Sequence, residues 1–178
     1  MSTVFSRRSF LKYTAVAAVA VAGTSLLGGC SGAEVSTSTK IGGSNTVLKV
    51  KSTLTALDFN ATGNTATVTF HLHIENGRWN DIHVINSNFY VRADNDLYQA
   101  EKLAVALQEG SASGPQIDRG QNADYLITMQ NVPASIEKLV FTFMPDTQYN
   151  EYQSIWILDK SVFNPDSETE NPDESQNS

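Results

Sequence analysis

Residues 67–75 read TVTFHLHIE, a segment in which polar and apolar side chains alternate without interruption. Because successive side chains of a β-strand point to opposite faces, this period of two predicts a strand with one buried and one solvent-exposed face. Val68, Phe70, Leu72 and Ile74 would lie on the buried face. Such a strand is typical of an antiparallel sheet that packs on one side only.

Further short strands are expected on both sides of this segment. A first strand of mixed pattern covers residues 47–59, and the turn-forming residues 60–64 (NATGN) predict a hairpin between it and the strand at 67–75. Residues 103–107 fit either a short strand or one helical turn. Four other strands are bounded by turn formers or proline, at residues 82–91 with a break at 86–88, 125–129, 139–143 and 155–158. The last is apolar on both faces, as a central strand would be, which places Trp156 in the core.

About seven short strands without a convincing long helix predict an all-β fold, an immunoglobulin-like antiparallel β-sandwich. Its domain would cover residues 46–163, which is enough chain for one core and too little for two. Residues 30–45 are rich in Gly, Ser and Thr, so a flexible tether with a span of about 20–24 Å is expected there. Residues 164–178 are acidic and lack large apolar side chains, which predicts a disordered tail.

The N-terminal residues contain an export motif. Arg7 and Arg8 precede a short segment rich in Ala and Val, and Phe10, Leu11 and Lys12 complete the pattern SRRSFLK. This pattern resembles the twin-arginine export signal. The resemblance implies passage of a folded protein across the cytoplasmic membrane.

Residues Leu27, Gly28, Gly29 and Cys30 resemble the lipobox of bacterial lipoproteins. The resemblance implies a signal peptide over residues 1–29 and a diacylglycerol on Cys30, which would anchor the protein to the outer face of the cytoplasmic membrane or the cell surface. Two acyl chains hold a protein stably, whereas one holds it marginally. The alternative is an uncleaved anchor helix. Cys30 is the only cysteine, so an intramolecular disulfide is impossible.

The charge balance excludes one class of partner. The chain has 12 Lys and Arg against 19 Asp and Glu, and loss of Arg7, Arg8 and Lys12 with the signal leaves 9 against 19, a net charge of −10. Nucleic-acid binding needs clustered cations that displace phosphate counterions, so we expect neither nucleic-acid binding nor electrostatic docking on anionic lipid. No flavin, haem, iron–sulfur or nucleotide motif follows the signal, and no cofactor is expected.

His71, His73 and His83 are the candidate metal ligands. The first two share one face of a strand, a spacing that some zinc enzymes use. His83 would join them only if the second and third strands were hydrogen-bonded neighbours. In an immunoglobulin-like sandwich these strands usually lie in different sheets, which favours ordinary solvent-facing histidines. Residues 94–96 (DND) are similarly better explained by an Asx-stabilised turn than by a calcium loop.

Trp79, Tyr149 and Tyr152 are the aromatic residues that could form a binding surface, with local packing as the alternative for the two tyrosines. No catalytic residue is predicted. The leading interpretation of the function is a lipid-anchored surface module that binds a protein or an envelope polymer without catalysis. The alternatives are a metal-binding lipoprotein or metal-dependent enzyme built on the three histidines, and an accessory subunit of a membrane complex.

Residues 46–160 also resemble a family of extracellular domains in Gram-positive lipoproteins, related to the secreted immunoprotective antigen of actinobacteria. The matching features are the strand at 70–76 that ends in Glu75-Asn76-Gly77, the strand Phe89-Tyr90-Val91, Arg119-Gly120, and Pro133 before the strand at 139–143. The resemblance implies an immunoglobulin-like fold and an exported binding or interaction role, with no catalytic residues to carry over.

Overall fold

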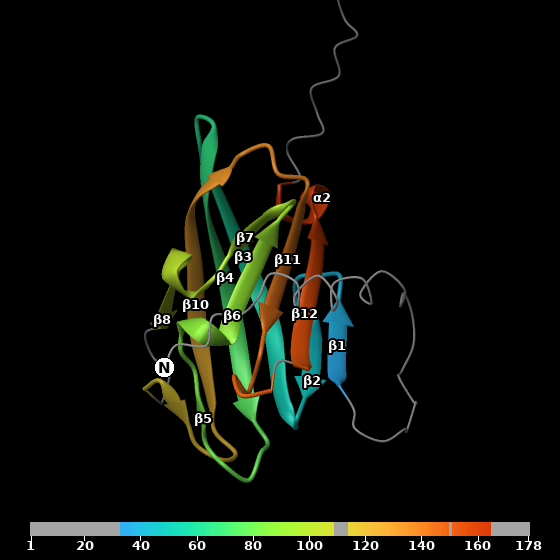
Figure 1. The fold of residues 1–178 in the computed structure, drawn as a ribbon, viewed down its shortest axis with the longest axis vertical. Helices are drawn as coiled ribbons and strands as arrows, with labels where there is room; N and C mark the ends of the chain where they lie inside the picture. The colour runs from blue at the N-terminus through green and yellow to red at the C-terminus, as the bar shows by residue number, and fades with distance from the viewer. Residues whose placement is uncertain (1–32, 109–113, 150, 165–178) are drawn as a thin grey trace, which may run out of the picture. The chain divides into compact units, whose positions relative to one another are not determined.

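The computed structural model describes residues 33–108, 114–149 and 151–164. All of them belong to one compact unit, Ala33–Ser178, and the separate unit Met1–Gly32 holds the predicted export signal and lipobox, which lie outside the described residues. The predicted acidic tail lies outside them too, apart from Asn164. Within the described part, two five-stranded sheets pack face to face, as Figure 1 shows.

The first sheet has the strand order β1-β12-β11-β6-β7. Its strands are β1 (Glu34–Ser38), β12 (Tyr152–Asp159), β11 (Lys138–Phe143), β6 (Phe89–Ala93) and β7 (Asp96–Tyr98). β1 and β12 run parallel, and the other neighbours are antiparallel. The apolar strand predicted at 155–158 is therefore an inner strand, flanked by β1 and β11.

The second sheet has the order β2-β3-β4-β10-β8 and is antiparallel throughout. Its strands are β2 (Ser44–Val47), β3 (Val50–Thr62), β4 (Thr65–Asn76), β10 (Asn122–Pro133) and β8 (Leu103–Leu107). The segment 67–75 lies within β4, at the centre of this sheet, and the predicted hairpin with β3 is confirmed.

Short elements connect the sheets. β5 (Ile82–His83) and β9 (Gln116–Ile117) form a two-stranded ribbon. The 3-10 turns η1 (Asn86–Asn88) and η2 (Ala100–Lys102) precede β6 and β8, and α2 (Lys160–Phe163) follows β12. The break predicted at 86–88 is therefore η1, and residues 103–107 are a strand. Among the described residues, no helix has the length and apolar character needed to cross a bilayer.

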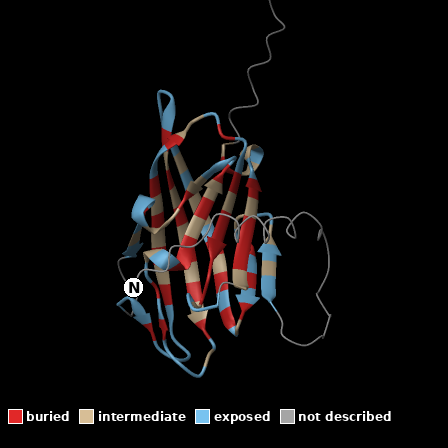
Figure 2. Ribbon diagram, viewed as in Figure 1, coloured by how far each residue is buried: buried red, intermediate tan, exposed pale blue. Residues whose placement is uncertain are grey.

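The core lies between the two sheets, where buried residues alternate with less buried ones along β4, β6 and most of β10 (Figure 2). Phe141 of β11 is its central residue. Its ring lies 4.4 Å from that of Phe70 on the facing sheet, 6.0 Å from that of Phe89 and 5.5 Å from that of Trp156. The predicted β-sandwich and the predicted burial of Trp156 are confirmed.

The N-terminal boundary of the domain differs from the prediction. Residues 34–38 form β1 and residues 44–47 form β2, so the flexible tether expected over 30–45 is wrong from Glu34 onward. Asn45 is buried and explains why this polar segment is ordered. Its Nδ2 donates to the carbonyl oxygen of Ile155 (3.0 Å), and its Oδ1 accepts from the Ser36 hydroxyl (2.9 Å), which joins β1 and β2 to β12.

The first strand predicted at 47–59 is divided in two. Leu48 and Lys49 both have positive φ, 51° and 63°. This is the geometry that two-residue hairpin turns require, because it matches the twist of the flanking strands. β2 therefore ends at Val47, and β3 begins at Val50. Nothing in the apolar pattern alone marks this turn.

Two tyrosines, the buried Tyr125 and the partly buried Tyr90, predict a loss of stability at high pH. Burial raises the pKa of Tyr125 and of Tyr90 to about 12, whereas a phenol in an unfolded chain ionises near pH 10. The folded state therefore holds these protons more tightly. The resulting stabilisation is complete below pH 10 and is lost as the pH rises towards 12. We expect Tyr125→Phe to lose less stability than the wild type between pH 9 and 11, measured by urea unfolding.

The matched control for this experiment is Tyr149→Phe, at a half-exposed ring. Tyr125→Phe also removes a hydrogen bond from the phenol to the carbonyl oxygen of Gly114 (3.2 Å), so its stability at neutral pH is the reference for its own pH series. An unchanged pH dependence in Tyr125→Phe would contradict the assignment.

Candidate functional site

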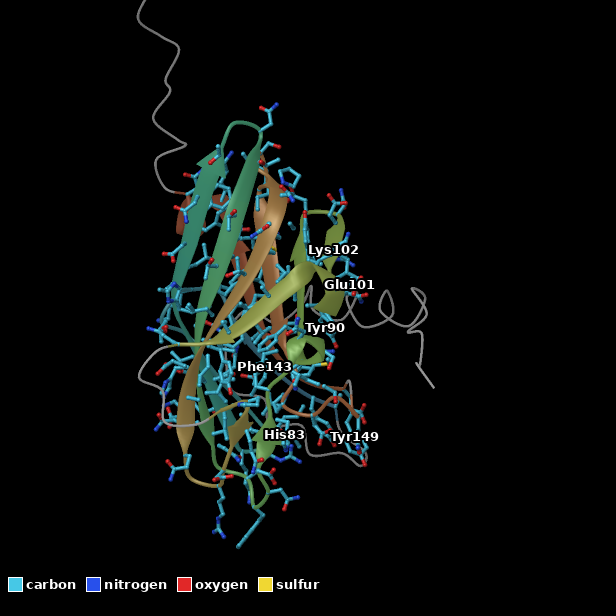
Figure 3. All side chains as sticks on the ribbon, turned by 90° about the vertical axis from the view of Figure 1, so that its left-hand side faces the viewer. His83, Tyr90, Glu101, Lys102, Phe143 and Tyr149 are labelled. Carbon is cyan, nitrogen blue, oxygen red and sulfur yellow. The ribbon has the colours of Figure 1, made fainter. Side chains whose placement is uncertain are left out.

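Four connections meet at one end of the sandwich, which we call the loop end. They are the β2–β3 turn (residues 48–49), the β4–β5 loop (77–81), the β9–β10 loop (118–121) and the β11–β12 loop (144–149). The amide of Gly77 donates to the carbonyl oxygen of Lys49 (3.0 Å), and the amide of Gly120 donates to that of Asn76 (2.7 Å). Figure 1 shows this end at the bottom, and Figure 3 labels His83 and Tyr149 there.

Asn76, the last residue of β4, holds the loop end together. Its side chain is 1% exposed, and its Nδ2 donates to the carbonyl oxygens of Asn80 and Ile117, both at 2.9 Å. Its Oδ1 accepts from the amide of Arg78 (2.9 Å). The next residue, Gly77, lies so close to the β2–β3 turn that a Cβ there would be 2.5 Å from the carbonyl oxygen of Lys49. The dipeptide Asn76-Gly77 therefore fixes the β4–β5 loop against two other connections.

We expect Asn76→Ala to destabilise the domain by about 2–3 kcal/mol, because buried carbonyl and amide groups would lose their partners. Denaturant unfolding measures this loss. Asn64→Ala is the matched control, since Asn64 is exposed in the β3–β4 turn, and its effect should stay below about 0.5 kcal/mol. Equal stability of the two variants would contradict the role assigned to Asn76.

Trp79 is the most exposed large apolar side chain described, at 73%. The guanidinium carbon of Arg119 lies 4.1 Å from the centre of its ring, a cation–π contact that joins the β4–β5 and β9–β10 loops. An open hollow of about 410 Å³ lies beside the indole and is lined by Glu34, Leu48, Lys49, Arg78, Trp79 and Asn80. Lys49 and Arg119 are exposed, and neither forms an ion pair with a carboxylate of the described residues.

A second open hollow of about 370 Å³ shares Arg78 and Asn80 with the first. Arg78 pairs with Asp146 at 3.2 Å, with both side chains mostly buried, so this ion pair joins the β4–β5 loop to the β11–β12 loop. His83 lines the second hollow and lies 3.1 Å from the carboxylate of Asp81. Because they share Arg78 and Asn80, the two hollows form one continuous surface at the loop end, with Trp79 as its large aromatic ring.

The two predicted tyrosines lie on the β11–β12 connection. Tyr149 is half exposed, Tyr152 is partly buried, and their rings meet edge to face with centroids 6.1 Å apart. Neither ring lines the two hollows. Trp79 and Tyr149 are thus the exposed members of the predicted binding surface, and Tyr152 supports Tyr149.

The three histidines do not form one site. His71 and His73 lie on the solvent-facing side of β4 and pair with Asp58 (2.8 Å) and Asp124 (2.7 Å) respectively. His83 belongs to β5, which pairs with β9 and not with β4. Within residues 33–108, 114–149 and 151–164, no cluster of three or more His, Cys, Asp or Glu side chains could hold a metal. The three-histidine alternative is therefore wrong, because these strands lie in different sheets.

The turn predicted at 94–96 is confirmed as the β6–β7 connection, which occupies residues 94 and 95 because β7 begins at Asp96. Asp94 has a positive φ of 48°, and its carboxylate accepts hydrogen bonds from the amides of Glu137 and Lys138. These backbone contacts account for the acidic residue without a cation.

Sequence reasoning missed Arg119 and Arg78 as members of the loop end. Arg119 entered only through the family resemblance. Its contact with Trp79 depends on the approach of two loops that are 40 residues apart in the chain, so no local pattern could reveal it. The Asn76-Gly77 turn signal was visible, but its three side-chain hydrogen bonds were not.

Comparison with known proteins supports the export signal and the fold. Residues 4–24 match the family model of the TAT (twin-arginine translocation) pathway signal sequence, so the predicted export signal is confirmed. No curated protein matches the chain. The match covers the N-terminal segment only and assigns the sandwich to no family.

The solved structures that are similar to the chain include three bacterial proteins. The yjhA protein of Bacillus subtilis is 15% identical, with a TM-score of 0.50 over 68% of this chain and 100% of that one. The candidate lipoprotein ycdA of Bacillus subtilis is 6% identical, with a TM-score of 0.51 over 70% of this chain and 41% of that one. The secreted protein MPT63 of Mycobacterium tuberculosis is 15% identical, with a TM-score of 0.46 over 70% and 98%. At these identities the first two show the fold alone, and membership of the antigen family stays a prediction.

Proposed function

We propose that this exported chain is a lipoprotein whose sandwich is displayed outside the cytoplasmic membrane and binds a component of the cell envelope through its loop end, without catalysing a reaction. The export signal at residues 4–24 supports the location. Leu27-Gly28-Gly29-Cys30 supports the lipid anchor, as does the similar fold of ycdA, described as a candidate lipoprotein. The partner class expected from the sequence is a protein or an envelope polymer.

The observation that carries the binding proposal is the exposed indole of Trp79 beneath the guanidinium of Arg119. Tryptophan and arginine are the residue types most enriched among side chains that dominate binding energies. The indole supplies a rigid apolar surface, and the guanidinium supplies planar donors for carboxylate or phosphate groups. Asn76 and the Arg78–Asp146 pair hold the loops around this surface, so little ordering would be needed on binding.

The surroundings of the histidines support a role without catalysis. Catalytic charge stabilisation is strongest in a water-excluded site with preorganised donors. His83, which lines the second hollow, is 62% exposed at an open surface. His71 and His73 lie on the solvent-facing side of β4, paired with carboxylates and outside both hollows.

Site-specific photo-cross-linking on intact cells tests the proposal. A photo-reactive amino acid is placed at position 80, an exposed position that lines both hollows and leaves Trp79 intact, or, as the matched control, at position 64 in the exposed β3–β4 turn. We expect a defined adduct from position 80 and none from position 64, because only the loop end carries the binding surface. A one-to-one protein adduct would favour an accessory subunit, whereas a polymer or lipid adduct would identify that component as the partner.

Export and membrane attachment of each variant are checked by fractionation before irradiation. Correctly localised protein that gives no adduct of any class from position 80 would overturn the binding proposal.

A further inference from the structure

The point of lipid attachment lies close to the loop end. β1 begins at Glu34 and runs parallel to β12, with Glu34 opposite Tyr152, where the β11–β12 loop ends. The carboxylate of Glu34 accepts a hydrogen bond from the amide of Leu48 (2.9 Å), and Glu34 lines the same hollow as Trp79. Figure 1 shows β1 starting at the lower end of the sandwich, where the loop end lies.

The covalent chain limits how far this end can move from an anchor. Cys30 precedes Glu34 by four residues, and four extended residues span at most about 14 Å. The tether of 20–24 Å expected from the sequence does not exist as free chain, because β1, the β1–β2 connection and the start of β2 take up residues 34–45. A diacylglycerol on Cys30 therefore holds the loop end at the membrane surface.

The opposite end of the sandwich cannot take this position. The β3–β4 turn at Gly63 and Asn64 is separated from the loop end by the whole length of β3, Val50–Thr62. At about 3.3 Å per residue, this strand spans roughly 40 Å. The β3–β4 turn therefore lies at the end of the sandwich that is far from the point of attachment.

The side chains of the loop end suit the region of lipid headgroups. Tryptophan and tyrosine favour the interface between bilayer and water, because one part of each ring system is apolar and the other forms hydrogen bonds. Trp79 is the most exposed large apolar side chain described, and half-exposed Tyr149 lies at the same end. Lys49 and Arg119 are exposed cations that can donate hydrogen bonds to the oxygens of phosphate groups.

We propose that the loop end contacts the phosphate-bearing headgroup layer of the membrane in which the protein is anchored, with Trp79 among the headgroups and Arg119 and Lys49 towards the phosphates. This inference rests on the proposed lipid attachment at Cys30. The net charge of −10 supplies no general attraction. The anchor serves in place of such an attraction. A short linker raises the effective concentration of the loop end at the headgroup layer to the millimolar range, where weak contacts are occupied.

The two tryptophans of the chain make the inference measurable. Trp156 is fully buried and Trp79 is exposed. The fluorescence of Trp79 is therefore obtained by subtracting the spectrum of the Trp79→Phe variant from that of the wild type. Because Cys30 is the only cysteine, protein from residue 30 onward can be coupled through it to maleimide-bearing lipid in phosphatidylcholine vesicles. This form contains the whole compact unit, Ala33–Ser178. The coupling is also independent of whether cells lipidate Cys30.

We expect the fluorescence of Trp79 in the coupled protein to shift to shorter wavelength and to be quenched by lipids brominated near the headgroup. Its quenching by aqueous acrylamide should fall severalfold. The matched control carries Cys30→Ser with Asn64→Cys and is coupled through the opposite end. Its Trp79 should remain as accessible to acrylamide as in the free protein. Full acrylamide access in the Cys30-coupled protein, or equal protection in both forms, would overturn the inference.

The outcomes separate this inference from the proposed function. A polymer or protein adduct from position 80 on cells, together with an unprotected Trp79 on vesicles, would sustain the binding module and reject the headgroup contact. A protected Trp79 on vesicles with Cys30 unmodified in cells would sustain the affinity of the loop end for lipid and reject the anchor.

Discussion

Replacing Phe141 by alanine is expected to destabilise the sandwich by about 3–5 kcal/mol, as truncation of buried phenylalanines does. Phe141 is fully buried, stacks on Phe70 of the facing sheet at 4.4 Å, and also contacts Phe89 and Trp156 within its own sheet. Alanine would leave a cavity between the sheets. Each sheet is held together by hydrogen-bonded strands, so neither sheet can collapse to fill this cavity. A loss of this size is a large part of the 5–15 kcal/mol that stabilises a typical domain.

Equilibrium unfolding in urea, followed by circular dichroism, measures this loss. Phe141→Leu is the matched variant, since it keeps most of the apolar volume and should cost about 1–1.5 kcal/mol. Phe59→Ala is a second comparison, because Phe59 packs at the edge of the core against Phe163 and is only partly buried. A loss below about 1 kcal/mol for Phe141→Ala would show that Phe141 is not the centre of the core.

Replacing Cys30 by serine is expected to release nearly all of the protein from the membrane fraction. Serine has no sulfur to receive a diacylglycerol, and the net charge of −10 of the chain without its signal opposes electrostatic docking on anionic lipid. Fractionation of cells and the mass of the N-terminal peptide measure the change. The loop end alone should not hold the released domain, since the effective concentration supplied by the anchor is lost.

A variant with Lys in place of both Arg7 and Arg8 separates failed export from failed anchoring. It should accumulate as a precursor inside the cell, whereas Cys30→Ser should appear outside the membrane. An unchanged membrane fraction for Cys30→Ser would favour the uncleaved N-terminal helix as the anchor. In that case the distance limit between the bilayer and Glu34 would no longer apply.

The two largest predictions test different levels of organisation. Phe141→Ala tests a core that is implied by the alternation of apolar residues along the strands. Cys30→Ser tests an attachment that is implied by a short N-terminal motif. The headgroup contact needs both, since it depends on a rigid sandwich and on an anchor four residues from β1.

Much of the sandwich was visible in the sequence because burial acts residue by residue along a strand. The alternation at 67–75, the turn-rich residues 60–64 and the doubly apolar segment 155–158 each report a local environment, and all three predictions are confirmed. The twin-arginine signal is likewise a local pattern, and its prediction is confirmed.

β1 could not be found in this way. Its residues, EVSTS, have no apolar period, and the strand exists because its backbone pairs with the edge of β12 and Ser36 meets Asn45. The loop end depends in the same way on contacts between distant segments, such as Trp79 with Arg119 and Arg78 with Asp146. The separation of His83 from His71 and His73 follows from the assignment of strands to sheets.

Strands with one buried and one exposed face could be located from the sequence, because hydrophobic burial leaves a periodic trace in the chain. Only the fold reveals that residues 34–38 of the supposed tether form a strand and that Glu34, where this strand begins, lines the same hollow as Trp79. Backbone pairing and contacts between loops leave no such trace, since they depend on which distant segments meet.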